Sequence, residues 1–106
     1  MPKYLFEAKY TAEGAKGIIH DGGTARRTAV EKAVAGLGGR LEVFYFAFGG
    51  ADAYVIVDLP DNVTAAAMAL AVGQSGKAST KTIVLLTPED VDAASKKSVV
   101  YRGPGG

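Results

Sequence analysis

The sequence predicts an α+β domain in which two helices cover one face of an antiparallel sheet. Three observations support this class. Four segments of strand length are rich in β-branched and aromatic residues, and apolar residues recur at helical spacing between them. Their order is strand, helix, strand, strand, helix, strand. The 106 residues suffice for one domain with one core.

The predicted strands are bounded by turn-forming residues. In the first strand the apolar residues alternate with charged ones, which predicts one buried face. Gly49 and Gly50 separate the second strand from the third, so that these two form a hairpin. The predicted strands are Lys3–Tyr10, Leu41–Phe48, Asp52–Leu59 and Ser79–Leu86.

Three helices are predicted from capping residues and spacing. Thr24 is the expected N-cap of the first helix, which ends at Gly38 and Gly39. The second runs from Asp61 to about Gln74 and is apolar on nearly every side. A third, short helix begins with Thr87, Pro88, Glu89 and Asp90. The glycine-rich segment Thr11–Gly23 is predicted to be mainly loop.

This order of elements is the ferredoxin-like β-α-β-β-α-β arrangement, with the two main helices on one face and a short C-terminal helix added. Residues 1–97 are expected to form one domain, because nothing in the composition divides them. Residues 98–106 are rich in glycine and proline, and we expect them to be a tail.

Composition excludes several classes of function. The net charge of +1 is too small to attract nucleic acid or an anionic membrane. The absence of cysteine excludes disulfides, zinc–thiolate sites and thiol nucleophiles, and a single histidine excludes a histidine-rich metal cluster. No signal peptide or membrane span is recognised. We therefore expect a cytoplasmic protein without metal or cofactor.

The second predicted strand is apolar on both faces, which predicts self-association. Phe44, Phe46 and Phe48 alternate with Leu41, Val43, Tyr45 and Ala47. Because the sheet face without helices would then expose a large apolar patch, we expect a homodimer or higher oligomer of the α/β-barrel type, packed face to face. The space between the sheets would hold a small apolar or aromatic ligand. The alternative is a monomer whose terminal helix or tail covers this face.

The segment FYFAFGGADAYVIVDLPD, Phe44–Asp61, resembles the GYD domain family. The resemblance extends to the stretches YTAEGAKG, GGTARR, LGGRLEVFYF, LPDN and LLTPEDVDAA. It implies a small, ferredoxin-like domain of the dimeric α/β-barrel type, for which no reaction and no catalytic residues are assigned. Gly49 and Asp52 of the family's name motif are present, but Ala51 stands where the motif has an aromatic residue.

Two residues are the candidates for acid–base catalysis. His20 is the one side chain that ordinarily titrates near neutral pH. Asp52 follows the predicted hairpin turn, where its carboxylate is placed to act as a base. Each has a structural alternative: a solvated histidine, and an aspartate that accepts N–H groups of the turn.

Five further residues are candidates for ligand binding. Arg26 and Arg27 lie in the first turn of the predicted helix, where positive charge opposes the helix dipole. They would bind a carboxylate or phosphate group, or form ion pairs with Glu7, Glu31 or a neighbouring subunit. Tyr10, Tyr45 and Tyr54 are strand tyrosines that would line a pocket, or serve as core or interface residues.

Two hypotheses of function follow. The first is an oligomeric module that binds a small molecule or a partner and has no catalytic activity. The second is a cofactor-free enzyme, monooxygenase- or isomerase-like by analogy of fold, that acts on an acidic aromatic or enol substrate. In the enzyme, His20 or Asp52 would be the base, and Arg26 or Arg27 would hold the anion.

Overall fold

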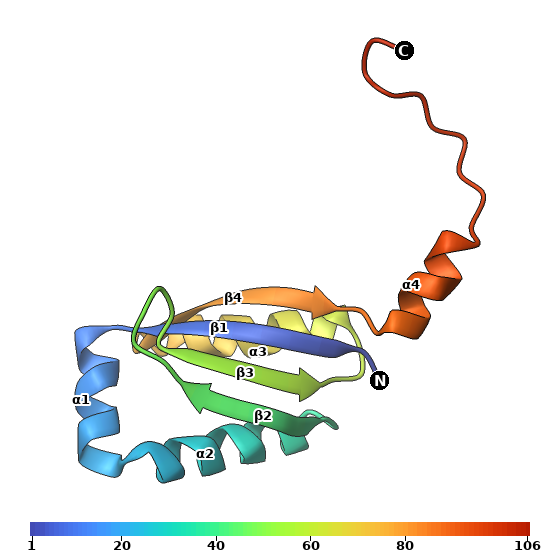
Figure 1. Cartoon of the computed structure of the whole chain (residues 1–106). Coiled ribbons are helices and arrows are strands. Elements are labelled where there is room, and N and C mark those ends of the chain that lie inside the picture. Colours follow the sequence, from blue (N-terminus) through green and yellow to red (C-terminus); the bar gives the residue numbers. More distant parts are fainter.

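The computed structural model describes residues 1–106 and contains one four-stranded antiparallel sheet in the order β2-β3-β1-β4 (Figure 1). This topology confirms the predicted ferredoxin-like arrangement. The elements are β1 (Lys3–Tyr10), α1 (Ala12–Asp21), α2 (Gly23–Gly36), β2 (Arg40–Phe46), β3 (Ala53–Asp58), α3 (Asn62–Gln74), β4 (Ala78–Leu85) and α4 (Pro88–Ser95).

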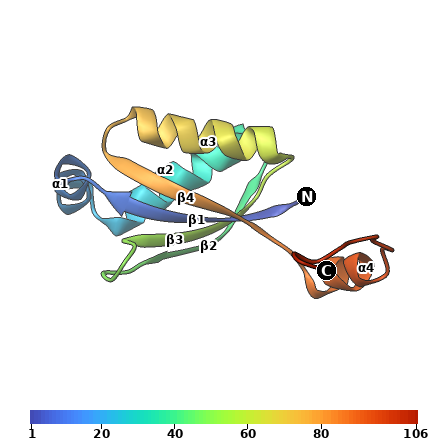
Figure 2. The same ribbon diagram turned by 90° about the horizontal axis from the view of Figure 1, so that it is seen from above.

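Helices α2 and α3 lie on the same side of the sheet, and the other side carries no helix (Figure 2). The core lies between these helices and the two central strands. Tyr4, Val57, Leu59 and Val34 are its largest fully buried side chains. The hydroxyl group of Tyr4 donates a 2.7 Å hydrogen bond to Asn62 at the start of α3, and this bond joins the helix to β1.

The prediction that residues 11–23 are mainly loop is wrong, because most of them form helix α1. Thr11 is its N-cap and accepts a hydrogen bond from the backbone N–H of Gly14. Gly22 then ends α1 and begins α2, with a φ of 87° that favours glycine. The predicted N-cap Thr24 therefore lies inside α2, two residues after its actual cap.

A β-bulge corrects the predicted faces of the second strand. The pairing with β3 shifts between Leu41 and Val43, so Leu41 packs against the core with Phe44 instead of facing away from it. The strand ends at Phe46, and Phe48 lies fully exposed in the hairpin loop.

Helix α3 begins as predicted, with Asp61 as the N-cap that accepts a 2.8 Å hydrogen bond from the N–H of Thr64. Its outer surface is apolar, and Val63 and Leu70 are largely exposed. Within one chain this helix is therefore buried on its core side alone.

Helix α4 and the following residues stand away from the sheet (Figure 1). Thr87 and Asp90 form the predicted capping box of α4. No residue from Pro88 onward is buried. The radius of gyration is 16.8 Å, whereas a compact domain of this length has ~13 Å. Neither α4 nor the tail covers the sheet face that lacks helices.

Candidate functional site

The sheet face without helices, which we call the open face, is crossed by an apolar row. Because residues paired across antiparallel strands share a face, the register brings one side chain from each strand into this row. The row lies across the middle of the sheet. Its members are Val43, Ile56, Leu5 and Ile83. Ile83 is 42% exposed, and the other three are half-buried.

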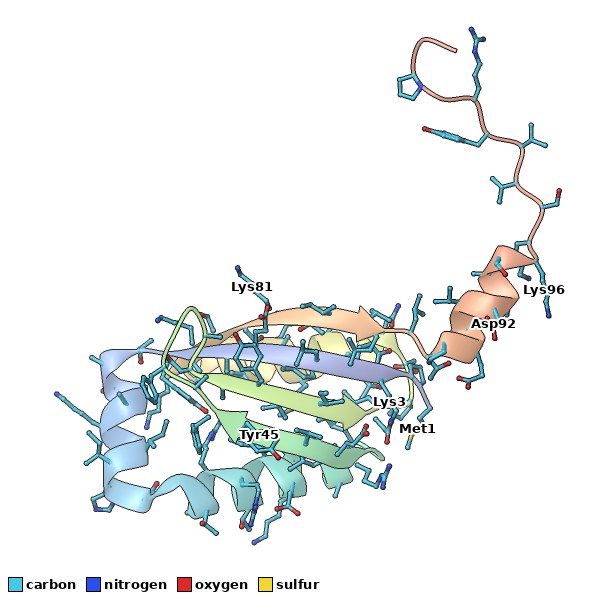
Figure 3. All side chains as sticks on the ribbon, in the orientation of Figure 1. Met1, Lys3, Tyr45, Lys81, Asp92 and Lys96 are labelled. Carbon is cyan, nitrogen blue, oxygen red and sulfur yellow. The ribbon has the colours of Figure 1, made fainter.

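Beside this row, Tyr45 of β2 pairs with Tyr54 of β3, and Glu7 and Lys81 continue the line across β1 and β4. Tyr45 is 71% exposed and Tyr54 is 38% exposed. Figure 3 shows Tyr45 on β2 and Lys81 on β4, at the two outer strands of the sheet. The structure thus brings together two of the three tyrosines singled out in the sequence.

A charged network lies on the other side of the apolar row. Lys3 Nζ is 2.6 Å from Glu42 Oε2 and 2.9 Å from Asp58 Oδ1, and Arg40 Nη2 is 3.1 Å from Asp58 Oδ2. The Lys3 and Arg40 hydrogen bonds lower the pKa of Asp58, although burial acts in the opposite direction. The hydrogen bonds to Glu42 and Asp58 raise the pKa of Lys3. These charges are satisfied within the chain.

At its hairpin end the open face is hollowed by a cavity of about 400 Å³. Tyr54, Glu7, Lys9 and Lys81 line it, together with Gly50 and Ala51 of the hairpin loop. Five of the nine residues that line this hollow are polar or charged, and the aromatic ring of Tyr54 belongs to a further one.

Asp52 holds the hairpin to the end of β1. Its carboxylate accepts a 2.9 Å hydrogen bond from the N–H of Tyr10, and Lys9 Nζ lies 3.8 Å from it. Its backbone N–H also donates to Ala8. These contacts are those of an aspartate that fixes the geometry of a turn.

His20 lies on α1, where its side chain is 87% exposed. Its Nδ1 is 2.8 Å from Oδ1 of Asp21, the next residue. Neither His20 nor Asp52 lines the hollow of the open face or the groove described next. The structure therefore brings the two catalytic candidates into no common cavity.

On the opposite side of the sheet, a groove of about 400 Å³ lies between α1, α2 and α3. Tyr10 of β1 and Arg26 of α2 both line it, so the third tyrosine is separated from the other two by the sheet. Arg27 is different, because its Nε lies 3.6 Å from Glu31 on the next turn of α2. The two neighbouring arginines thus have different surroundings.

The sequence interpretation missed the other walls of this groove. Helix α3 contributes Met68, Ala71 and Val72, and α1 contributes Gly14, Gly17 and Ile18. Ala25, Ala29 and Ala33 recur every fourth residue on α2 and form a wall of small side chains. This recurrence is a signal for a groove, because alanines at that spacing leave room beside a helix.

The chain brings no three metal-ligating side chains together. None of its helices combines the length and the apolar character needed to cross a membrane.

Comparison with protein families matches the GYD domain over residues 4–95. No curated protein and no solved structure matches the chain. The matched range includes all four helices and the whole sheet except Lys3, the first residue of β1. The chain therefore belongs to the GYD domain family.

Proposed function

We propose that this protein is a self-associating binding module. Two copies pack with their open faces against each other, and the space between the sheets holds a small molecule with an aromatic or apolar body. The observation that carries this proposal is the apolar row Val43, Ile56, Leu5 and Ile83 on a sheet face that no helix covers. Such a row favours burial, because contact between apolar side chains removes them from water.

The exposed area is consistent with a missing partner. The chain exposes 7321 Å², whereas a compact protein of its 10.9 kDa mass exposes ~5,600 Å². A standard interface buries about 800 Å² on each partner. Part of the excess belongs to α4 and the tail, and the open face supplies a surface for such an interface.

The charges of the open face are compatible with a second copy. Glu7 and Lys81 are neighbours in register, yet the six ion pairs of the chain include neither. In a two-fold symmetric pair, the same patch meets itself, so Glu7 of one copy can approach Lys81 of the other. The network of Lys3, Glu42, Asp58 and Arg40 is already satisfied, which lowers the cost of covering it.

The ligand space is the hollow beside Tyr54. Packing of a second sheet would close this hollow from the solvent and place Tyr45 and Tyr54 of both copies around it. The tyrosine rings suit an aromatic ligand, and Lys9, Lys81 and Glu7 supply polar contacts at its edge. Native mass spectrometry of freshly purified protein should show a dimer that carries a small molecule.

Sedimentation equilibrium tests the assembly with a matched pair of variants. The wild type should be a dimer or larger at micromolar concentration. Ile56→Lys should be a monomer, because it places a charge in the apolar row. Ile19→Lys makes the same change on α1, where Ile19 is 85% exposed, and should leave the assembly intact.

Tyr45→Lys provides a second variant at an exposed position of an edge strand, in case Ile56→Lys does not fold. Circular dichroism establishes whether each variant is folded. A wild-type protein that remains monomeric at micromolar concentration would overturn the proposal. An assembly that both open-face variants leave intact would overturn it too, since the interface would then lie elsewhere, for example on α3.

A further inference from the structure

We propose that the groove between α1, α2 and α3 is a second binding site, for a small organic carboxylate whose apolar body lies along the groove and whose carboxylate is bound by Arg26. This site lies on the helix side of the sheet, so it is separate from the interface proposed above. It does not depend on that interface, and no residue of the apolar row contributes to it.

The packing of the helices leaves the space in which the groove lies. Helix α2 packs against β2, and α3 packs against β4, so the two helices cover opposite edges of the sheet. Tyr10 and Ala78 of the two adjacent strands β1 and β4 line the groove between them, and α1 closes one end. Its volume of about 400 Å³ is in the lower part of the range for small-molecule pockets, ~300–1,000 Å³.

Arg26 is the reason to expect an anion in this groove. Its Nε is buried and has no hydrogen-bond partner, and it is the one buried side-chain nitrogen or oxygen of the chain in this condition. None of the six ion pairs includes Arg26. A buried donor of a charged group without a partner is unfavourable. Arg26 lines the groove, so a ligand carboxylate there would pair with its guanidinium group, whose planar fork matches the two carboxylate oxygens.

The lining argues for an apolar body on this ligand. Ten of the seventeen residues that line the groove are hydrophobic. A narrow apolar cavity of about 40 Å³ adjoins the groove, and Tyr10, Arg26 and Met68 are among the residues that line both. An alkyl chain or aromatic ring would fill this space, whereas inorganic phosphate would leave it empty.

The remaining charged groups of the groove favour an anion over a cation. Lys77 lines the rim and adds a second positive charge. Asp21 is the one carboxylate in the lining, and its Oδ1 already lies 2.8 Å from His20 Nδ1.

Titration calorimetry with octanoate, using the full-length protein, tests this site. Octanoate should bind in a saturable manner. The affinity for octanol should be lower by at least about ten-fold, because octanol lacks the charge that pairs with Arg26. Arg26→Gln should lower the affinity for octanoate by about ten-fold or more, whereas Arg27→Gln should leave this affinity unchanged. Inorganic phosphate should bind more weakly than octanoate.

Ala29→Phe tests the apolar part of the site with Arg26 intact. Ala29 lines the groove and is exposed, so a larger side chain there should fill the groove without disturbing the core. Octanoate binding should then be lost, and the unfolding transition should remain cooperative.

Three results would overturn the proposal. These are no binding of octanoate at millimolar concentration, equal binding of octanol and octanoate, and equal weakening by Arg27→Gln and Arg26→Gln. If Arg26→Gln does not fold, Ala29→Phe and the comparison of octanoate with octanol decide the question. Because Ile56→Lys changes the other side of the sheet, it should leave octanoate binding intact, and this result separates the two proposals.

Discussion

The main-chain N–H of Tyr10 donates a 2.9 Å hydrogen bond to the carboxylate of Asp52, across 42 positions of the sequence. This bond joins the β2–β3 hairpin to the last residue of β1. It extends the pairing of β1 with β3 beyond Ala8 and Ala53, where the ladder ends. Asp52 therefore stabilises the fold, whatever further role the hairpin has.

Replacement of Asp52 by alanine should destabilise the fold by about 1–3 kcal/mol, because the partly buried N–H of Tyr10 loses a charged acceptor. Asp52→Asn keeps an acceptor oxygen, so it should lose less stability than Asp52→Ala. The free energy of unfolding in urea measures both effects. Asp92→Ala, on the exposed helix α4, is the control and should have almost no effect. If Asp52→Ala is as stable as the wild type, the hairpin is held by other contacts.

Substitution by alanine should have opposite effects on stability at Gly14 and at Gly17 of α1. A Cβ at Gly14 would lie 2.0 Å from the carbonyl oxygen of Lys77, so Gly14→Ala should destabilise by about 1–3 kcal/mol. A Cβ at Gly17 would meet nothing within 4 Å, and Gly17→Ala should stabilise the helix by about 0.5–1 kcal/mol. Thermal and urea unfolding of the two variants measure the difference. Equal effects of the two substitutions would show that α1 is not packed against the α3–β4 turn.

The same glycines explain why the sequence predicted most of the fold but not α1. Alternation, helical spacing and caps depend on local residues, and they were sufficient for the four strands, α2, α3 and α4. The helix α1 depends on a distant contact, because Thr11 binds Gly76 and Lys77 while Gly14 fits closely against that turn. Glycine used for close packing has the same sequence signature as glycine used in a loop.

The candidate site was predictable in part, for a related reason. Strand alternation correctly suggested that the sheet has apolar residues on both faces, but the bulge at Leu41 changed which residues they are. Tyr10, Tyr45 and Tyr54 could be identified as strand tyrosines, whereas their division between the two faces follows from the register. The difference between Arg26 and Arg27 depends on the rotation of about 100° between successive residues of α2, together with the placement of α1 and α3.

The charged network of the open face should make stability depend on pH at both extremes. Asp58 has a lowered pKa in the folded state, chiefly because Lys3 donates to it. Its contribution is therefore present above the unfolded value of about 3.9 and is lost as the pH falls through the lower folded value. Lys3 has a raised pKa, so its contribution is present below the unfolded value of about 10.4 and is lost as the pH rises through the higher folded value.

Urea unfolding of the wild type between about pH 2 and pH 7 should show the loss of stability that accompanies protonation of Asp58. The midpoint of this loss should lie below the pH range in which an aspartate ordinarily titrates. Asp58→Asn should be less stable at pH 7 by about 1–3 kcal/mol, because two charged donors lose their acceptor, and its stability should change less with pH in the acid range. Asp92→Asn should retain the wild-type profile. A profile for Asp58→Asn that parallels the wild type would show that the acid sensitivity arises from other carboxylates.

Removal of residues 88–106 should leave the stability of the sheet and of α1, α2 and α3 nearly unchanged. None of these nineteen residues is buried in the chain, and α4 has no extensive packing against another element. The free energy of unfolding should therefore change by no more than about 0.5 kcal/mol, as for surface substitutions.

Val91, Val99 and Tyr101 are nevertheless exposed apolar residues that a second copy can bury. If the truncated protein loses the oligomeric state of the full chain while it keeps the same unfolding free energy at low concentration, this segment contributes to assembly and not to the fold. A loss of more than about 1 kcal/mol at low concentration would instead indicate that α4 docks on its own sheet in solution.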